Sequence, residues 1–266
     1  MRLLVKRRLW PLVFVALATV AWPQTGFAQA KPRLRPLHIA LANNSVTMTA
    51  IYVAKHLGIF ESYGFDARVL VLEPRAGLAA LLTGDLHFYT AIGSTGRAAL
   101  RGAPVRVALV SLNRPDFMLV AGKDITSVEQ LKGKLIGGYT PQGTVNVVLT
   151  ELLRRKGLRP EEYKIVNAGT ARAAALAGGS VPAALLNSAE TVRLVKQGFR
   201  VIARAADELE IPQSGLGVSI ASLQGNRDFL RAGTRAVLDA LKIIANQKEK
   251  TVTVLMKELS LSHDEA

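Results

Sequence analysis

The chain has 266 residues, of which 49% are hydrophobic and 20% are charged, and its formal net charge is +14. This composition excludes a disordered polypeptide and suffices for one large or two small domains with a buried core. The absence of cysteine excludes disulfides, thiolate chemistry and a lipid anchor on a cysteine.

The first 30 residues have the organisation of a secretory signal peptide. Four basic residues lie within residues 2–8, residues 9–22 are apolar, and Ala28-Gln29-Ala30 is a small-residue cleavage signature. The apolar run is shorter than the about 20 residues of a membrane span. We therefore expect a periplasmic protein cleaved after Ala30. Arg7-Arg8 leaves both the general and the twin-arginine export routes open.

Removal of this leader lowers the formal charge from +14 to +10, because it contains four basic and no acidic residues. Nucleic acid, an anionic envelope surface and an anionic small ligand are the partners that a basic protein can have. The basic residues are scattered, no nucleic-acid-binding motif is present, and export argues against nucleic acid. A solvated basic surface is the simplest alternative.

In chain order, residues 37–42 form a predicted buried strand, and the polar loop Asn43-Asn44-Ser45 follows it. Residues 47–60 have helical apolar spacing, and residues 67–72 form a second strand. A strand, a helix and a strand in this order predict a βαβ unit and a largely parallel sheet. Residues 134–169 repeat this order.

A second repeated pattern follows each of these units. Residues 75–113 and 172–206 both read helix, glycine, strand, polar turn, helix, glycine, strand. The inner glycines Gly84 and Gly102 are 18 residues apart, and Gly179 and Gly198 are 19 apart. The spacing predicts two similar α/β halves in tandem. Because a helix, a glycine and a strand often follow one another in α/β proteins, a chance similarity is the alternative.

The segment 134–157 is the most suggestive local feature. It combines a short strand (135–139), a turn containing Pro141 and Gly143, and a helix that Thr144 could cap. A polar loop at a helix start presents free backbone N–H groups, which suits an anion. An ordinary connection between a strand and a helix is the simpler interpretation.

The remaining predicted elements are less distinctive. They are a strand at 116–120, a short helix ending at Gly133 with a capping box at 126–130, a strand at 215–222, and helices at 228–246 and 251–259.

Several spaced motifs resemble one family. They are AKHLGIFESYGFDARV (54–69), LTGDLHFYTAIG (82–93), TSVEQLKGKLIGGYTPQGT (126–144) and VKQGFRVI (195–202). With the leader and the loop at 43–45, they resemble the periplasmic substrate-binding proteins of ABC transporters. Within these, the chain resembles the group that binds alkanesulfonates, taurine, nitrate or pyrimidine precursors (thiamine-biosynthesis-like).

This resemblance implies an α/β fold of two Rossmann-like lobes joined by two crossover strands (type II periplasmic binding protein), with the ligand cleft between them. The crossovers would lie near 116–120 and 218–222. Lobe I would then comprise residues 36–122 plus 215–266, and lobe II residues 123–214. Two features depart from the family: Pro182 stands where an acidic residue is common, and the C-terminus is shortened, without further helices that brace lobe I.

Open α/β sheets bind ligands at the carboxyl ends of their strands, so the loops there are the candidate site. Their hydroxyl, amide and backbone N–H groups suit a small polar or anionic ligand. Helix caps, Asx-turns and, for the arginine, simple solvation are the structural alternatives. The candidate residues are Asn43, Asn44, Ser45, Arg75, Ser94, Thr95, Gln142, Gly143, Thr144, Asn187 and Glu190.

Catalytic and metal sites find little support. The four histidines lack the spacing of a metal motif, and there is no thiolate. Ile92 stands where a nucleophile elbow requires glycine, and Ile220 interrupts a dinucleotide-binding pattern. We therefore expect no catalytic residue, no metal and no cofactor.

The sequence thus predicts a monomeric solute-binding protein that closes by a hinge and delivers its ligand to an inner-membrane ABC permease. An enzyme of pyrimidine-precursor (thiamine) synthesis on the same scaffold and a sensory ligand-binding module are the alternatives. The identity of the ligand and that of the permease are left open.

Overall fold

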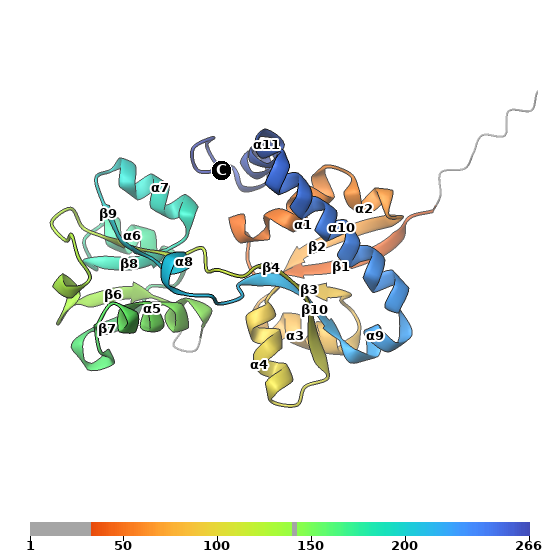
Figure 1. The fold of residues 1–266 in the computed structure, drawn as a ribbon, viewed down its shortest axis with the longest axis horizontal. Helices are drawn as coiled ribbons and strands as arrows, with labels where there is room; N and C mark the ends of the chain where they lie inside the picture. Colours follow the sequence, from red (N-terminus) through yellow and green to blue (C-terminus); the bar gives the residue numbers. More distant parts are fainter. Residues whose placement is uncertain (1–32, 140–142) are drawn as a thin grey trace, which may run out of the picture. The chain divides into compact units, whose positions relative to one another are not determined.

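A computed structural model describes residues 33–139 and 143–266, whose strands form two five-stranded sheets (Figure 1). The predicted signal peptide and Gln142 lie outside these described residues. The first sheet has the order β2 (Phe65–Val71), β1 (Arg35–Leu41), β3 (Phe88–Tyr89), β10 (Ser214–Ser219), β4 (Val105–Leu112). The second has the order β7 (Lys164–Asn167), β6 (Leu135–Gly138), β8 (Ala183–Leu186), β5 (Met118–Ala121), β9 (Arg200–Arg204).

The two sheets have the same topology. In each, the first strand of that half pairs in parallel with its second and third strands. The fourth place holds an antiparallel strand, β10 in one sheet and β5 in the other, which follows the passage of the chain from the opposite sheet. The prediction of two similar α/β halves is therefore confirmed, and the sheets are mixed rather than simply parallel.

The four glycines that marked the repeat share one backbone conformation. Gly84, Gly102, Gly179 and Gly198 have φ of +87°, +90°, +73° and +92°, values that residues other than glycine rarely adopt. Each glycine reverses the chain after a helix before the following strand. The repeat in the sequence thus reflects a repeated steric requirement.

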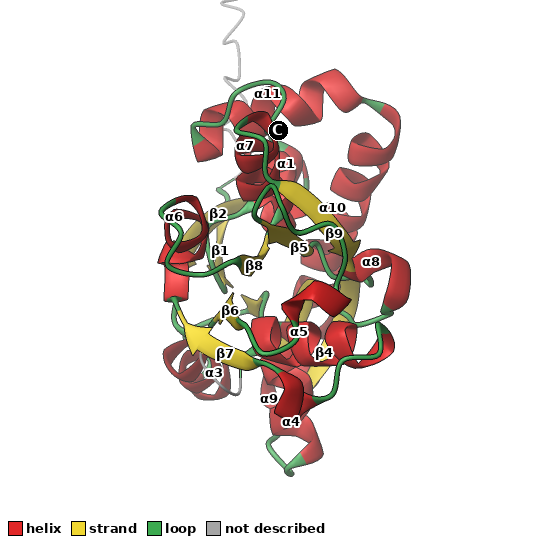
Figure 2. Cartoon of the chain, turned by 90° about the vertical axis from the view of Figure 1, so that its left-hand side faces the viewer, coloured by secondary structure: helices red, strands yellow, loops and turns green. Residues whose placement is uncertain are grey.

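Helices lie on both sides of the strands (Figure 2). The elements of the first half and the C-terminal part are η1 (Val46–Met48), α1 (Thr49–His56), α2 (Ile59–Ser62), α3 (Pro74–Thr83), α4 (Ile92–Leu100), α9 (Ile220–Gly225), α10 (Arg227–Asn246) and α11 (Lys248–Leu259). Those between β5 and β10 are η2 (Glu129–Leu131), α5 (Thr144–Arg155), η3 (Pro160–Glu162), η4 (Gly169–Ala171), α6 (Arg172–Ala177), α7 (Ser188–Lys196) and α8 (Ala205–Glu208). Within residues 33–139 and 143–266, no helix is both long and apolar enough to cross a membrane.

Separate apolar clusters hold these layers to the sheets. Side chains of α1, α10 and α11 pack with β1 residues such as Leu37 and Ile39, both fully buried. A smaller cluster joins α3 and β3 to Val105 of β4. In the second sheet, α5 packs on Ile136 of β6. Burial of the apolar face of each helix is the main stabilising term.

Three boundaries differ from the prediction. The helix expected at 47–60 is divided at Gly58, whose φ is +68°. The strand expected at 215–222 ends at Ser219, because the Ser219 hydroxyl accepts the Ser222 N–H at 3.2 Å and caps the unpredicted helix α9. Helix α8 was also not predicted. Its residues are too few for helical periodicity to be recognised.

Pro182 is accommodated because β8 begins one residue later, at Ala183. The lost backbone donor is therefore not needed by the ladder, while the Pro182 carbonyl still accepts the Gly122 N–H at 3.0 Å.

His87 should make stability depend on pH. Burial, then the charge of nearby His38, lowers the pKa of His87 below its usual 6.5, and its Nδ1 accepts the His38 N–H at 3.0 Å. Below about pH 6.5, His87 of the unfolded chain binds a proton more readily than His87 of the folded chain. The free energy of unfolding therefore decreases as the pH is lowered through this range. Urea titrations between pH 7.5 and 5.5 should show a shallower fall for His87→Asn. Equal slopes in the two proteins would contradict this.

Candidate functional site

The loop after β1 is held by its own polar side chains. The Ser45 hydroxyl donates to Asn43 Oδ1 at 2.7 Å, and the Tyr52 hydroxyl donates to Asn44 Oδ1 at 2.5 Å. Burial chiefly raises the pKa of Tyr52, so this hydroxyl stays protonated as a donor. Both asparagines are exposed and keep their amide NH₂ groups available. The loop is thus a prepared edge with donors facing outward.

The start of α4 offers backbone N–H groups and the guanidinium of Arg97 to a ligand. Ala91 stands at its N-cap without a side-chain cap among the described residues, and no acidic residue lies in the first turn. Arg97, one turn along, donates from Nη2 to Ser94 Oγ at 3.3 Å. A helix start without a cap or an acid carries a partial positive charge, and Arg97 adds a full one beside it.

Thr95 is placed differently from its predicted role. It is fully buried, and both its hydroxyl and its N–H donate to Ala91 O, at 3.1 and 3.0 Å. Its side chain packs so closely on Gly217 that a Cβ there would lie 2.7 Å from Thr95 Oγ1. A ligand contact by Thr95 would require this packing to change.

The start of α5 is shaped by Asn146. Asn146 is only 7% exposed, and its Oδ1 accepts the Tyr139 N–H at 2.7 Å, which ties the residue after β6 to α5. Gly143 is the N-cap, and Thr144 is the first helical residue, so the prediction that Thr144 caps the helix is wrong. The helix again has no acidic residue in its first turn. It therefore presents a second positive helix end.

These two helix starts lie close together. A Cβ built on Gly93 would be 3.6 Å from Arg97 Nη1 and 3.6 Å from Thr144 Oγ1. Because Gly93 has no side chain, a methyl-sized space stays unfilled between a guanidinium, a hydroxyl and the N-termini of α4 and α5. Two positive helix ends and an arginine around one space favour an anion.

The start of α7, in contrast, is already satisfied. Asn187 and Glu190 form a capping box, with bonds of 2.9 and 3.0 Å. Asp116 adds a carboxylate there, because its Oδ2 accepts the Ser188 hydroxyl at 2.9 Å. The helix-cap alternative therefore describes the side chains of Asn187 and Glu190 in this structure. The carboxylates of Glu190 and Asp116 thus already offset the positive end of α7, so this helix start does not favour a further anion.

Arg172 is a buried arginine near the start of α7 that the sequence analysis did not single out. Its side chain is almost fully buried; Nε donates to Leu185 O at 2.8 Å, and Nη1 donates to Gly169 O at 2.6 Å. Nη2 lies 3.7 Å from Glu190 Oε2, and the guanidinium lies over the Tyr139 ring. It ties β8 to the loop after β7. Only its place at the start of a helix could have drawn attention to it.

Arg75 lies at the exposed start of α3, and no hydrogen bond or ion pair of its side chain is recorded among the described residues. The hollows found on α10 and between α7 and β9 are not lined by the α4 or α5 starts. Within residues 33–139 and 143–266, no group of acidic or histidine side chains could hold a metal ion.

Known proteins resemble the chain in family and in fold. A sequence model of the family described as "NMT1/THI5 like" matches residues 45–251. Among curated proteins no sequence matches.

Three solved structures illustrate the shared fold, and their identities of 15–20% make this a similarity of fold. The periplasmic aliphatic sulphonate binding protein SsuA from Escherichia coli is 20% identical with a TM-score of 0.70, covering 87% of this chain and 81% of its own. The alkanesulfonate-binding protein SsuA from Xanthomonas axonopodis pv. citri, bound to MOPS, is 18% identical with a TM-score of 0.69, covering 89% and 82%. The periplasmic nitrate-binding protein NrtA from Synechocystis PCC 6803 is 15% identical with a TM-score of 0.72, covering 89% and 70%.

Proposed function

Because the chain belongs to the NMT1/THI5-like family, we propose that it is a periplasmic solute-binding protein of an ABC importer rather than an enzyme. The names of its structural neighbours support this role, since they bind sulfonates or nitrate in the periplasm. Cleavage after Ala30 would release the protein as a soluble monomer. A permease of the inner membrane would be its partner, and nucleic acid would not.

The ligand we propose is a small anion, such as a sulfonate, nitrate or a carboxylate. The observation that carries this is the space beside Gly93, which has Arg97 and the starts of α4 and α5 around it. Asn43, Asn44, Ser45 and Ser94 would complete the contacts at its edge.

The geometry also suggests how binding would be transmitted. Gly93 belongs to the half that contains the first sheet, and Thr144 to the half that contains the second. An anion held by both helix starts would favour the arrangement in which the two lobes, one around each sheet with β5 in the second, are closed. A ligand can shift such an equilibrium only by its differential affinity for the two arrangements. Two opposed positive helix ends supply that difference, because they repel each other when the site is empty.

A thermal-unfolding panel tests this function. We expect one anion among alkanesulfonates, taurine, nitrate, aromatic carboxylates and pyrimidine precursors to raise the melting temperature. At about 100 times its Kd it should add about 2.7 kcal/mol, or about 5 to 11 °C. A neutral analogue of equal size, such as 1-propanol beside 1-propanesulfonate, is the control. A shift with the neutral member alone would contradict an anion site, and conversion of the compound would support an enzyme.

A further inference from the structure

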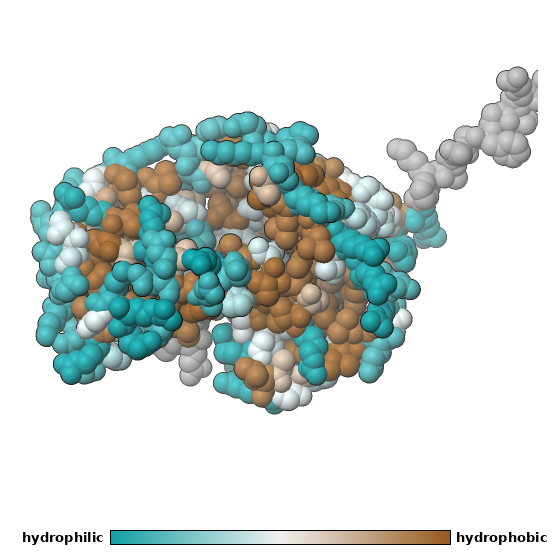
Figure 3. All heavy atoms as spheres, viewed as in Figure 1, coloured by the Kyte–Doolittle hydropathy of each residue, from teal (hydrophilic) through white to brown (hydrophobic). Residues whose placement is uncertain are grey.

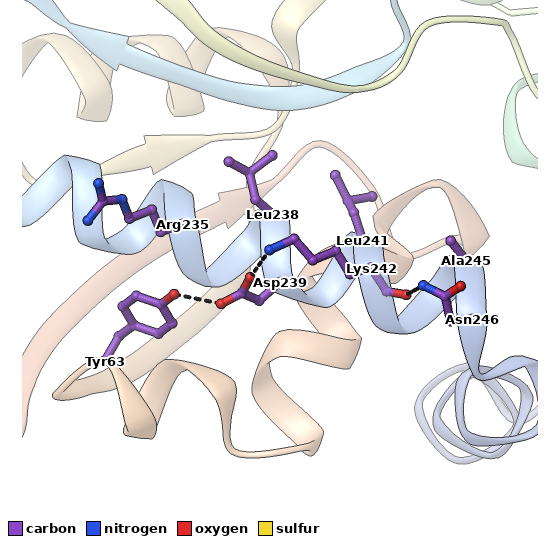
Figure 4. A pocket seen from close by; sticks show the side chains of 8 residues that line it. All are labelled: Tyr63, Arg235, Leu238, Asp239, Leu241, Lys242, Ala245 and Asn246. Carbon is purple, nitrogen blue, oxygen red and sulfur yellow. Dashed lines mark hydrogen bonds and ion pairs between the residues drawn. The ribbon is translucent and has the colours of Figure 1, made fainter.

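A groove follows α10 along the first sheet, away from the anion site. One hollow of about 580 Å³ has an apolar floor formed by Ala108, Val218, Leu223 and Leu238. Another, of about 720 Å³, continues from Arg235 and Leu238 towards Lys242 and Asn246 (Figure 4). We call these two hollows together the α10 groove.

The floor of the groove is incompletely covered. β4 is an edge strand that pairs only with β10 among the described strands. Leu238, which lines both hollows, is 40% exposed, and Val107 and Val110 of β4, which lie outside the hollows, are 39% and 40% exposed. Figure 3 shows an apolar patch over β4 and β10, bordered by a diagonal band of polar residues along α10.

The border of the groove is positively charged. Arg227, Arg231 and Arg235 are spaced by four residues, so they lie along one side of α10, and all three line the first hollow. Arg231 reaches Asp228 only at 4.0 Å, and that carboxylate is 96% exposed. No ion pair of Arg227 or Arg235 is recorded within the described residues. These three arginines, which we call the arginine row, are therefore available for an acidic partner.

The other end of the groove is electrostatically satisfied. The Tyr63 hydroxyl and Lys242 Nζ both donate to Asp239, at 2.6 and 2.7 Å (Figure 4). The hydrogen bonds from Lys242 and Tyr63 hold the pKa of Asp239 below its usual range, which keeps this carboxylate ionised. A partner therefore meets unpaired positive charge mainly beside the first hollow.

We propose that the α10 groove docks an amphipathic helix of a partner protein that carries acidic residues at four-residue spacing. Its apolar side would fill the hollow beside Ala108 and Leu238, and its acidic side would meet the arginine row. A second copy of this chain is disfavoured, since two arginine rows would repel each other. A flat lipid surface is disfavoured too, because it could not fill a recess whose floor includes the fully buried Val218.

The chain offers a direct reporter, because it contains no cysteine. A single cysteine at Ala108, labelled with a polarity-sensitive dye, would sit on the floor of the hollow. The probe is a synthetic helical peptide with leucines on one face and glutamates at four-residue spacing beside them. We expect saturable binding with a blue shift of the dye. A label at exposed Lys134, in the half that contains the second sheet, should not respond.

Charge reversal tests the recognition. The double variant Arg231→Glu/Arg235→Glu should weaken peptide binding about tenfold or more, since exposed pairs each contribute a small term that reversal turns repulsive. The control Arg101→Glu/Lys164→Glu changes the net charge equally at exposed positions elsewhere and should leave binding within about twofold. Melting temperatures would confirm that both variants are folded.

Three results would overturn the proposal. One is equal affinity of the arginine-row variant and its control. Another is equal affinity for a peptide with lysines in place of the glutamates. The third is a dye response to anionic phosphatidylserine vesicles without a response to the acidic peptide, which would assign the groove to a membrane surface.

Discussion

Replacing Arg97 by glutamine should weaken binding of the anion identified by the thermal panel by about 10- to 100-fold. Arg97 is the guanidinium beside the space at Gly93, and a hydrogen bond to a charged group contributes about 1.5 to 3 kcal/mol. Glutamine keeps an amide donor, on a side chain two bonds shorter, and removes the charge. Isothermal titration calorimetry on both proteins gives the comparison.

Arg101 provides the matched control, because it lies at the exposed C-terminal end of the same helix. Arg101→Gln removes the same charge about one turn away and should change the affinity by no more than about twofold. Equal losses in the two variants would mean that the anion senses only the general charge of the protein. Unchanged affinity in Arg97→Gln would remove this residue from the site.

Gly215→Ala should lower the free energy of unfolding by about 3 to 4 kcal/mol, near the upper end of single substitutions. Gly215 lies in β10 at an irregularity of its pairing with β4. A Cβ there would lie 2.0 Å from the Leu109 carbonyl oxygen and 3.1 Å from Val110 Cα. Both are backbone atoms, so β10 and β4 would have to separate. Urea unfolding should show a lower midpoint.

Gly225→Ala serves as its control. Gly225 ends α9, and nothing lies within 4 Å of a Cβ built there. Its φ is not positive, so alanine should be neutral or stabilise by about 0.4 to 1 kcal/mol. Equal stability of Gly215→Ala and Gly225→Ala would contradict this prediction, because it would mean that β10 and β4 accommodate a methyl group at Gly215.

Most of the fold could be predicted from local patterns. The pattern at 75–113 predicted a strand after Gly102, which is β4, and the repeated glycines marked two halves that share one topology. Such features depend on apolar periodicity and on backbone conformations that only glycine adopts readily. Predictions failed at the ends of elements. Ser219 ends β10 because its side chain caps α9, and Gly143 rather than Thr144 stands at the N-cap position of α5, without a side-chain cap among the described residues.

The candidate site was less accessible to prediction. Loops at strand ends could be named, but the sequence left open whether Asn187 and Glu190 bind a ligand or cap α7, as they do here. A further bond at this helix start, from the Ser188 hydroxyl to Asp116, joins residues 72 apart in the chain and follows from no local pattern. Arg97 and Arg172 were not named because exposed and buried arginines look alike in a sequence.

The sequence by itself determined the elements, their order, the twofold repetition and the loops in which a ligand site could lie. These follow from periodicity, turn chemistry and the steric freedom of glycine, all of which act between near neighbours in the chain. The tertiary structure alone decided that Gly93 and Thr144 lie close together, with Arg97 beside them. It also decided that the carboxylate of Asp116 lies at the positive end of α7. Contacts between residues far apart in sequence depend on the packing of whole sheets and helices, which no local pattern records.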